Sequence, residues 1–98
     1  MNISFPEKKG KIVFNDFSIK DSIPLSEQIN DLKEDMLQIE FPNNFILDVG
    51  WRPSFDINGK FFIYLIKNFD WSAPVYYSNA KDMPSLYNQI SLAINKIE

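Results

Sequence analysis

Residues 45–67 read FILDVGWRPSFDINGKFFIYLIK, and this stretch decides the fold. Every second residue from Phe45 to Trp51 is a large apolar one, which predicts a strand with one face against a core. The run at 61–67 is apolar on both faces and predicts a central strand. Asp56-Ile57-Asn58-Gly59 between the two runs predicts a turn, with Asn58-Gly59 able to adopt positive φ. The stretch therefore predicts two long antiparallel strands.

Upstream of this pair, residues 12–14 predict a first strand, and residues 3–5 a short additional edge strand. Residues 24–39 predict a helix that begins near Pro24 and is followed by Pro42. Apolar residues recur in this segment at spacings of four, three, four and three, which places them on one helical face: Leu25, Ile29, Leu32, Met36 and Ile39.

Downstream, residues 75–78 predict a further strand, joined to the central pair as an antiparallel meander by links too short for crossovers. A second helix is predicted after Asp82, with this residue as N-cap and Pro84 in the first turn. The predicted order is β-α-β-β-β-α. We therefore expect one α+β domain over residues 1–98, a two-layer sandwich in which two helices cover one face of a sheet of about four strands.

Composition excludes several chemistries. The 98 residues contain no cysteine and no histidine, which excludes Ser-His-Asp and Cys-His mechanisms and the common zinc sites. The net charge is −3 without a basic stripe, so no nucleic-acid partner is expected. Neither a signal peptide nor a membrane span is recognisable, so the expected location is cytoplasmic without a membrane partner. We expect no catalysis, no cofactor and no metal.

Asp48 is the first candidate for partner binding, because strands rarely place aspartate between Leu47 and Val49. It either pairs with a cation of a partner or has a purely structural role, on the solvent side of the sheet or in a hydrogen bond to the neighbouring turn. Tyr64 and Tyr76 are expected on the same face as Asp48, together with Ile46, Phe62 and Ile66. If both helices cover the opposite face, this exposed apolar surface indicates an interaction site, a homodimer contact or a surface covered by the N-terminal segment.

Aromatic and charged residues also cluster at Trp51-Arg52 and at Phe69-Asp70-Trp71. Tryptophan and arginine are enriched at interface centres, although either tryptophan could instead fill the core. The meander places these two clusters at opposite ends of the central strand, so we do not expect one patch. Asp56 resembles part of a calcium loop, but Lys67 stands at the position of the bidentate glutamate, which favours a simple turn.

Four motifs resemble a group of small bacterial proteins: LKEDMLQ at 32–38, DVGW at 48–51, DING at 56–59 and DWSAP at 70–74. The resemblance covers about half of the chain. Similar proteins act as immunity proteins in polymorphic toxin and contact-dependent growth inhibition systems. The resemblance implies tight non-covalent binding to a cognate toxin domain, often a nuclease. A homodimeric structural or adaptor domain is the alternative, and a carboxylate hydrolase using Asp48 and Asp56 is a third.

Overall fold

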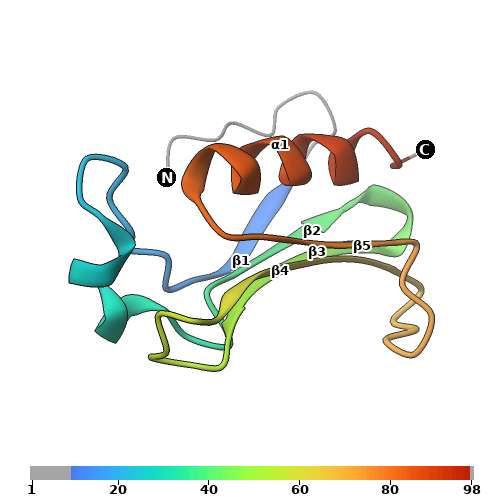
Figure 1. Cartoon of the computed structure of the whole chain (residues 1–98). Helices are drawn as coiled ribbons and strands as arrows, with labels where there is room; N and C mark the ends of the chain where they lie inside the picture. Colours follow the sequence, from blue (N-terminus) through green and yellow to red (C-terminus); the bar gives the residue numbers. More distant parts are fainter. Residues whose placement is uncertain (1–9, 98) are drawn as a thin grey trace.

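The computed structural model describes residues 10–97, as one antiparallel sheet and one α-helix (Figure 1). The strands are β1 (Lys11–Asn15), β2 (Leu37–Phe41), β3 (Phe45–Arg52), β4 (Lys60–Lys67) and β5 (Tyr76–Ala80), and the helix is α1 (Met83–Ile94). The five strands lie in the sheet in chain order. The predicted α+β class and the meander are confirmed. The prediction of four strands and two helices was wrong, because the sheet has five strands and one α-helix packs on it. The strand predicted at 3–5 lies outside the described residues.

The helix predicted at 24–39 was wrong. Its first half forms two short 3-10 turns, Leu25–Glu27 and Ile29–Asp31, and its second half is the strand β2. The buried Gln28 side chain holds the first half in a compact loop, because it accepts a hydrogen bond from the Lys20 amide and donates to two backbone carbonyls. The second half alternates buried and more exposed residues, as in a strand.

Residues 33–36 run beside the end of β3 without joining it regularly. The Trp51 amide donates to the Lys33 carbonyl at 2.7 Å, and the Met36 amide donates to the Val49 carbonyl at 3.1 Å. Between these two bonds the backbone at Glu34 passes directly over Gly50, where an added Cβ would lie 1.8 Å from the Glu34 carbonyl oxygen. Only glycine at position 50 permits this close crossing.

The predicted pair of central strands is confirmed as β3 and β4, with register pairs from Phe45↔Lys67 to Arg52↔Lys60. The connection between them departs from the predicted turn, because no described glycine adopts a positive φ and Phe55 does so instead, at φ 62°. Gly59 is needed for space, since a Cβ there would lie 2.6 Å from Trp51 Nε1. The position predicted for the turn is therefore confirmed, but the predicted positive φ at Asn58-Gly59 is not.

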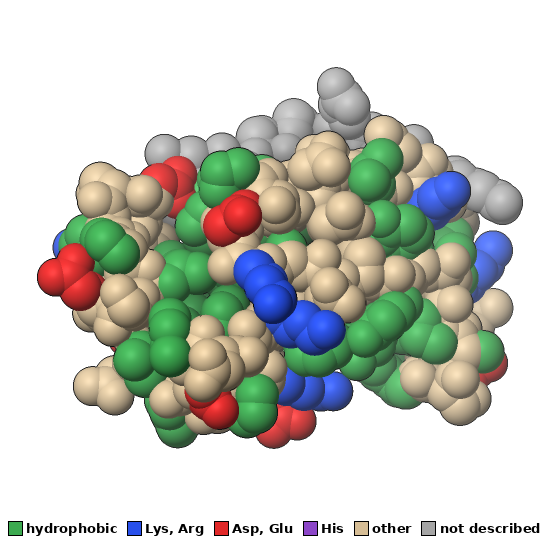
Figure 2. Space-filling model, in the orientation of Figure 1, with side chains coloured by type: hydrophobic (Ala, Val, Ile, Leu, Met, Phe, Trp, Pro, Cys, Tyr) green, Lys and Arg blue, Asp and Glu red, His purple; other side chains and the backbone are tan. Residues whose placement is uncertain are grey.

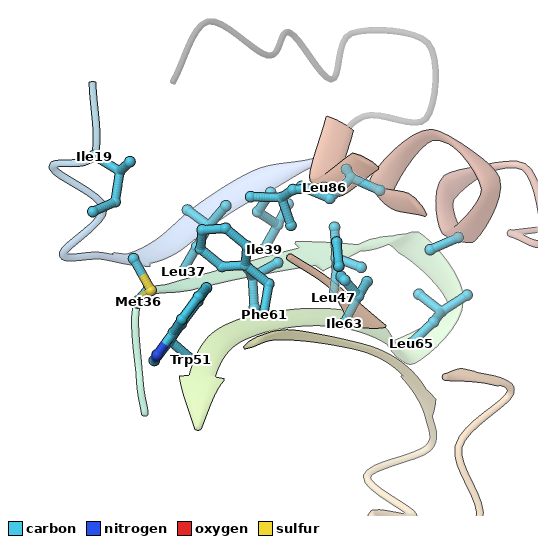
Figure 3. Close-up of a cluster of buried hydrophobic side chains, with 14 of the residues drawn as sticks. Ile19, Met36, Leu37, Ile39, Leu47, Trp51, Phe61, Ile63, Leu65 and Leu86 are labelled. Carbon is cyan, nitrogen blue, oxygen red and sulfur yellow. The ribbon is translucent and has the colours of Figure 1, made fainter. Parts of the chain in front are cut away.

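The core lies between the sheet and α1, as Figure 3 shows for the side chains of Leu37, Leu47, Phe61 and Leu86. The predicted Asp82 N-cap is confirmed, because the Asp82 carboxylate accepts from the Ser85 amide at 2.8 Å. The helix buries Met83, Leu86, Ile90 and Ala93 and packs over β4 and β5. None of the helical segments within 10–97 is long and apolar enough to cross a membrane.

Candidate partner-binding surface

The face of the sheet turned away from α1 is called the open face here. Cross-strand pairs place its side chains in rows: Gln38, Asp48, Tyr64 and Tyr77 form the central row. Ile46 and Ile66 belong to the same face but are buried. They lie near the end of the sheet where the β4–β5 connection runs on the side away from α1 (Figure 1). The accessible part of the open face therefore begins at the central row and extends toward the ends of β3 and β5.

Three aromatic rings from two strands form a cluster on the open face. The ring centroids of Tyr64 and Tyr77 lie 5.0 Å apart, and that of Phe62 lies 6.4 Å from Tyr64 and 6.1 Å from Tyr77. These spacings are within the range of favourable aromatic pairs. Tyr77 is 50% exposed, so the cluster combines mutual packing with contact surface. Figure 2 shows hydrophobic side chains, with Lys and Arg beside them, along the lower part of the molecule below β5.

Arg52 lies at the edge of this cluster. Its guanidinium carbon is 5.5 Å from the Phe62 ring centroid and 5.7 Å from that of Tyr64, a cation–π geometry. Its Nη1 donates to the Tyr64 hydroxyl at 3.3 Å, and its Nε lies 3.4 Å from Glu34 Oε1. Both partners of this ion pair are exposed, so it adds little stability. The contacts instead hold the guanidinium over the Phe62 and Tyr64 rings.

Asp48 is the half-buried carboxylate in the central row. The pKa of Asp48 is raised to about 6, mainly by burial and also by the negative charge of Asp35, while the Gln38 hydrogen bond and the Arg52 charge act to lower it. Its Oδ1 atom is buried without a hydrogen-bond partner. Because an ionised carboxylate needs solvent or partners, this position is electrostatically unfavourable in the isolated protein.

A shallow open pocket of about 210 Å³ lies beside this row and is lined by Phe14, Asp35 and Gln38. Gln38 pairs with Asp48 on one side and with Phe14 on the other, so the pocket is separated from Asp48 by one strand. Phe14 is itself exposed, which leaves the pocket with an apolar wall and a charged rim.

Of the predicted residues, the structure brings Asp48, Arg52 and Tyr64 together on the open face. The placement of Tyr76 on this face was wrong. Tyr76 pairs with Leu65 and packs against the core, where its hydroxyl donates to Gln89 Oε1 at 2.6 Å. Tyr77 lies on the open face instead, because the pairing register sets Tyr77 opposite Tyr64.

Trp51 and Asp56 act within the fold. Trp51 is 1% exposed and packs edge-to-face on Phe61 with centroids 4.8 Å apart (Figure 3). Its Nε1 donates to the Asp56 carbonyl at 2.8 Å, and the Asp56 carboxylate accepts from the Asn58 amide. The interpretation of Asp56 as a turn residue is confirmed by these bonds. Trp51 therefore offers almost no surface to a partner.

Asp70 and Trp71 lie in the β4–β5 connection, away from the aromatic cluster. Asp70 caps this turn by accepting from the amide and hydroxyl of Ser72, and Trp71 is 48% exposed. The preceding Phe69 adopts φ 61° and is also exposed. The prediction that Trp51-Arg52 and Phe69-Asp70-Trp71 lie at opposite ends of the central strand β4 is confirmed.

Sequence reasoning missed Asp35 and Gln38 because it assigned both to a helix, and it placed Phe14 in a strand without a role in binding. The alternation in Leu37-Gln38-Ile39-Glu40-Phe41 was the signal that could have identified a strand.

No family model matches the chain, and no curated protein or solved structure matches it either. Among residues 10–97, no group of three or more His, Cys, Asp or Glu side chains is placed to hold a metal ion. The function proposed below therefore depends on the chemistry of the open face and on the motif resemblance.

Proposed function

We propose that this protein is a bacterial immunity protein that binds a cognate toxin domain and neutralises it by forming a tight non-covalent complex. It acts in the cytoplasm as part of a polymorphic toxin or contact-dependent growth inhibition system, without catalysis and without a cofactor. The observation that carries the proposal is the aromatic and charged surface on the open face, which Phe62, Tyr64, Tyr77 and Arg52 form on two paired strands and the end of a third.

Such a surface suits protein recognition. Tyrosine and arginine contribute strongly at interface centres, and aromatic side chains lose little conformational entropy on binding. The rings lie on regular strands rather than on loops, so they are held in place before a partner arrives. Preorganisation of this kind lowers the ordering cost of association. The motif resemblance supports a toxin domain as the partner.

Growth rescue tests the proposal. The C-terminal domain encoded immediately upstream of this gene would be expressed from an inducible promoter, alone and together with this protein. We expect the domain to arrest growth, co-expression to restore it, and the two proteins to co-elute in size-exclusion chromatography. The proposed role would be contradicted if the domain arrests growth, co-expression of this protein does not restore growth, and the two proteins do not bind each other.

A homodimeric structural or adaptor domain is the second candidate, and the edge strand β1 favours it. Ile12, Val13 and Phe14 are all exposed on this strand. An apolar edge strand can pair with the same strand of a second copy. Light scattering of the purified chain distinguishes the two functions, because the adaptor function requires a dimer of about twice 11.5 kDa without any partner.

A further inference from the structure

We propose that the tip of the β4–β5 connection, formed by residues 68–75, is a second contact site for the protein partner, and that Phe69 and Trp71 enter an apolar pocket of that partner. The inference deepens the proposed function and rests on it for one point, the toxin domain as the partner. The tip is separate from the aromatic cluster but lies on the same side of the sheet, away from α1 (Figure 1).

The backbone of the tip places a phenylalanine where a bulky side chain is sterically disfavoured. The Asp70 amide donates to the Lys67 carbonyl at 3.1 Å, and the two residues between them, Asn68 and Phe69, have φ values of 55° and 61°. Positive φ at both central residues is typical of a type I′ turn, in which Asn, Asp and Gly are the preferred residues. Asn68 fits this preference, and Phe69 does not.

The Phe69 ring gains little from packing within the described residues, because it is 63% exposed. Trp71 and Val75 of the same connection are 48% and 46% exposed. Backbone strain of this kind is concentrated at ligand-binding sites, and grouped exposed apolar residues mark interaction surfaces. Folding alone therefore does not account for a phenylalanine at position 69, whereas a partner that buries its ring does.

Hydrogen bonds to neighbouring strands and turns hold the tip in place. The Asn68 amide donates to the Asn44 carbonyl at 2.9 Å, and Asn44 Nδ2 donates to Asn68 Oδ1 at 3.3 Å, which ties the tip to the β2–β3 connection. At the other end of the tip, the Val75 amide donates to the Leu65 carbonyl at 2.8 Å. The exposed rings are thus presented on a backbone that is fixed before binding, which lowers the cost of association.

The charges of the tip favour a protein pocket over a membrane or a second copy. Residues 68–80 contain no Lys or Arg, and Asp70 is their only charged residue. Segments that bind at a membrane surface usually carry basic residues that attract anionic lipids. Two copies that meet tip to tip would bring their Asp70 carboxylates together, which like-charge repulsion opposes. An apolar pocket of a different protein, with a neutral or basic rim, complements both the rings and the charge.

The test uses the full chain and three variants in calorimetric titrations with the toxin domain encoded upstream. Phe69→Gly and Trp71→Ala are each expected to raise Kd at least about tenfold, since aromatic residues that fill a pocket dominate binding. Phe55→Gly is the matched control, because Phe55 also has a positive φ, 62°, and is 55% exposed, but lies in the β3–β4 connection at the opposite end of β4. This control is expected to change Kd less than about twofold.

Thermal unfolding followed by circular dichroism separates an effect on binding from an effect on folding. Phe69→Gly gives the turn the Asn-Gly sequence that type I′ turns prefer, so its midpoint is expected to lie within about 4 °C of the native value or above it. A midpoint that is more than about 4 °C lower would overturn the inference, because the ring would then stabilise the fold.

Unchanged Kd in both tip variants, or equal weakening by Phe69→Gly and Phe55→Gly, would overturn the inference and leave the immunity function intact, because the native chain still binds the toxin domain. A native chain that does not bind a toxic upstream domain would overturn both. Co-sedimentation with vesicles of phosphatidylcholine and phosphatidylglycerol that Phe69→Gly abolishes would assign the tip to lipid, and a concentration-dependent dimer that this variant abolishes would assign it to a second copy. Either of these results overturns the inference.

Discussion

Replacing Asp48 by asparagine should stabilise the isolated protein at neutral pH, because the native environment disfavours the ionised carboxylate. Folding raises the pKa of Asp48 from 3.8 to about 6. At about 1.4 kcal/mol for each tenfold change in the acid constant, the full effect corresponds to about 3 kcal/mol. The side chain is only partly buried, so solvent screening reduces the expected gain to about 1–2 kcal/mol.

The sign follows from proton linkage. Below about pH 3 the carboxyl is protonated in both the folded and the unfolded chain, so the native protein and Asp48→Asn should differ little. Between about pH 3 and 6 the unfolded chain ionises first, and the stability of the native protein falls relative to the variant. Above about pH 7 the difference should be constant.

Urea unfolding at pH 4, 5, 6 and 7.5, followed by the fluorescence of the buried Trp51, measures this difference directly. Glu40→Gln is the matched control, because Glu40 is exposed on the same face, and its free energy of unfolding should change by less than about 0.5 kcal/mol. A variant less stable than the native protein at pH 7.5, or a gain that does not depend on pH, would refute the reasoning about Asp48.

Three further substitutions test other parts of the structure. Gly50→Ala should destabilise the fold by about 3 kcal/mol or more, because its Cβ would meet the Glu34 carbonyl and disrupt the adjoining backbone bonds; circular dichroism during heating measures the loss. Trp51→Phe should cost about 1–3 kcal/mol in urea unfolding, since the Asp56 carbonyl loses its indole donor and the core loses volume; an unchanged midpoint would count against this role. Arg52→Ala should change stability by less than about 1 kcal/mol, because the guanidinium is exposed, yet weaken binding to the toxin domain in a calorimetric titration.

The central part of the fold was predictable because its signals agreed. The alternation of apolar residues in β3, the continuous apolar run of β4, the polar connection and the strand lengths all indicate one hairpin. The C-terminal helix was equally clear, because the Asp82 cap and the apolar stripe begin at the same place. These elements are determined by local sequence and by one buried face each.

Residues 24–39 were mispredicted because their apolar positions fit two periods. Met36 and Ile39 continue a helical spacing from Leu25, but Leu37, Ile39 and Phe41 also alternate as a strand. Pairing with β3 decides between the two periods, and this pairing is a tertiary contact that no local pattern contains. The same error removed Gln38 and Asp35 from the predicted site.

The candidate site was therefore predictable only where it lies on the hairpin. Asp48, Arg52 and Tyr64 were identified because β3 and β4 fix their faces. Tyr76 was misplaced because a shift of one residue in pairing register exchanges the two faces of a strand. Predicting Tyr77 would have required the exact register between β4 and β5.

The most direct test of the proposed function is an isothermal calorimetric titration of the purified chain with the toxin domain encoded upstream. The proposal predicts a one-to-one complex with a dissociation constant on the order of nanomolar or lower, as in tight complexes of standard interface size. A domain that arrests growth but gives no binding heat, and that elutes separately from this protein, would contradict the immunity role.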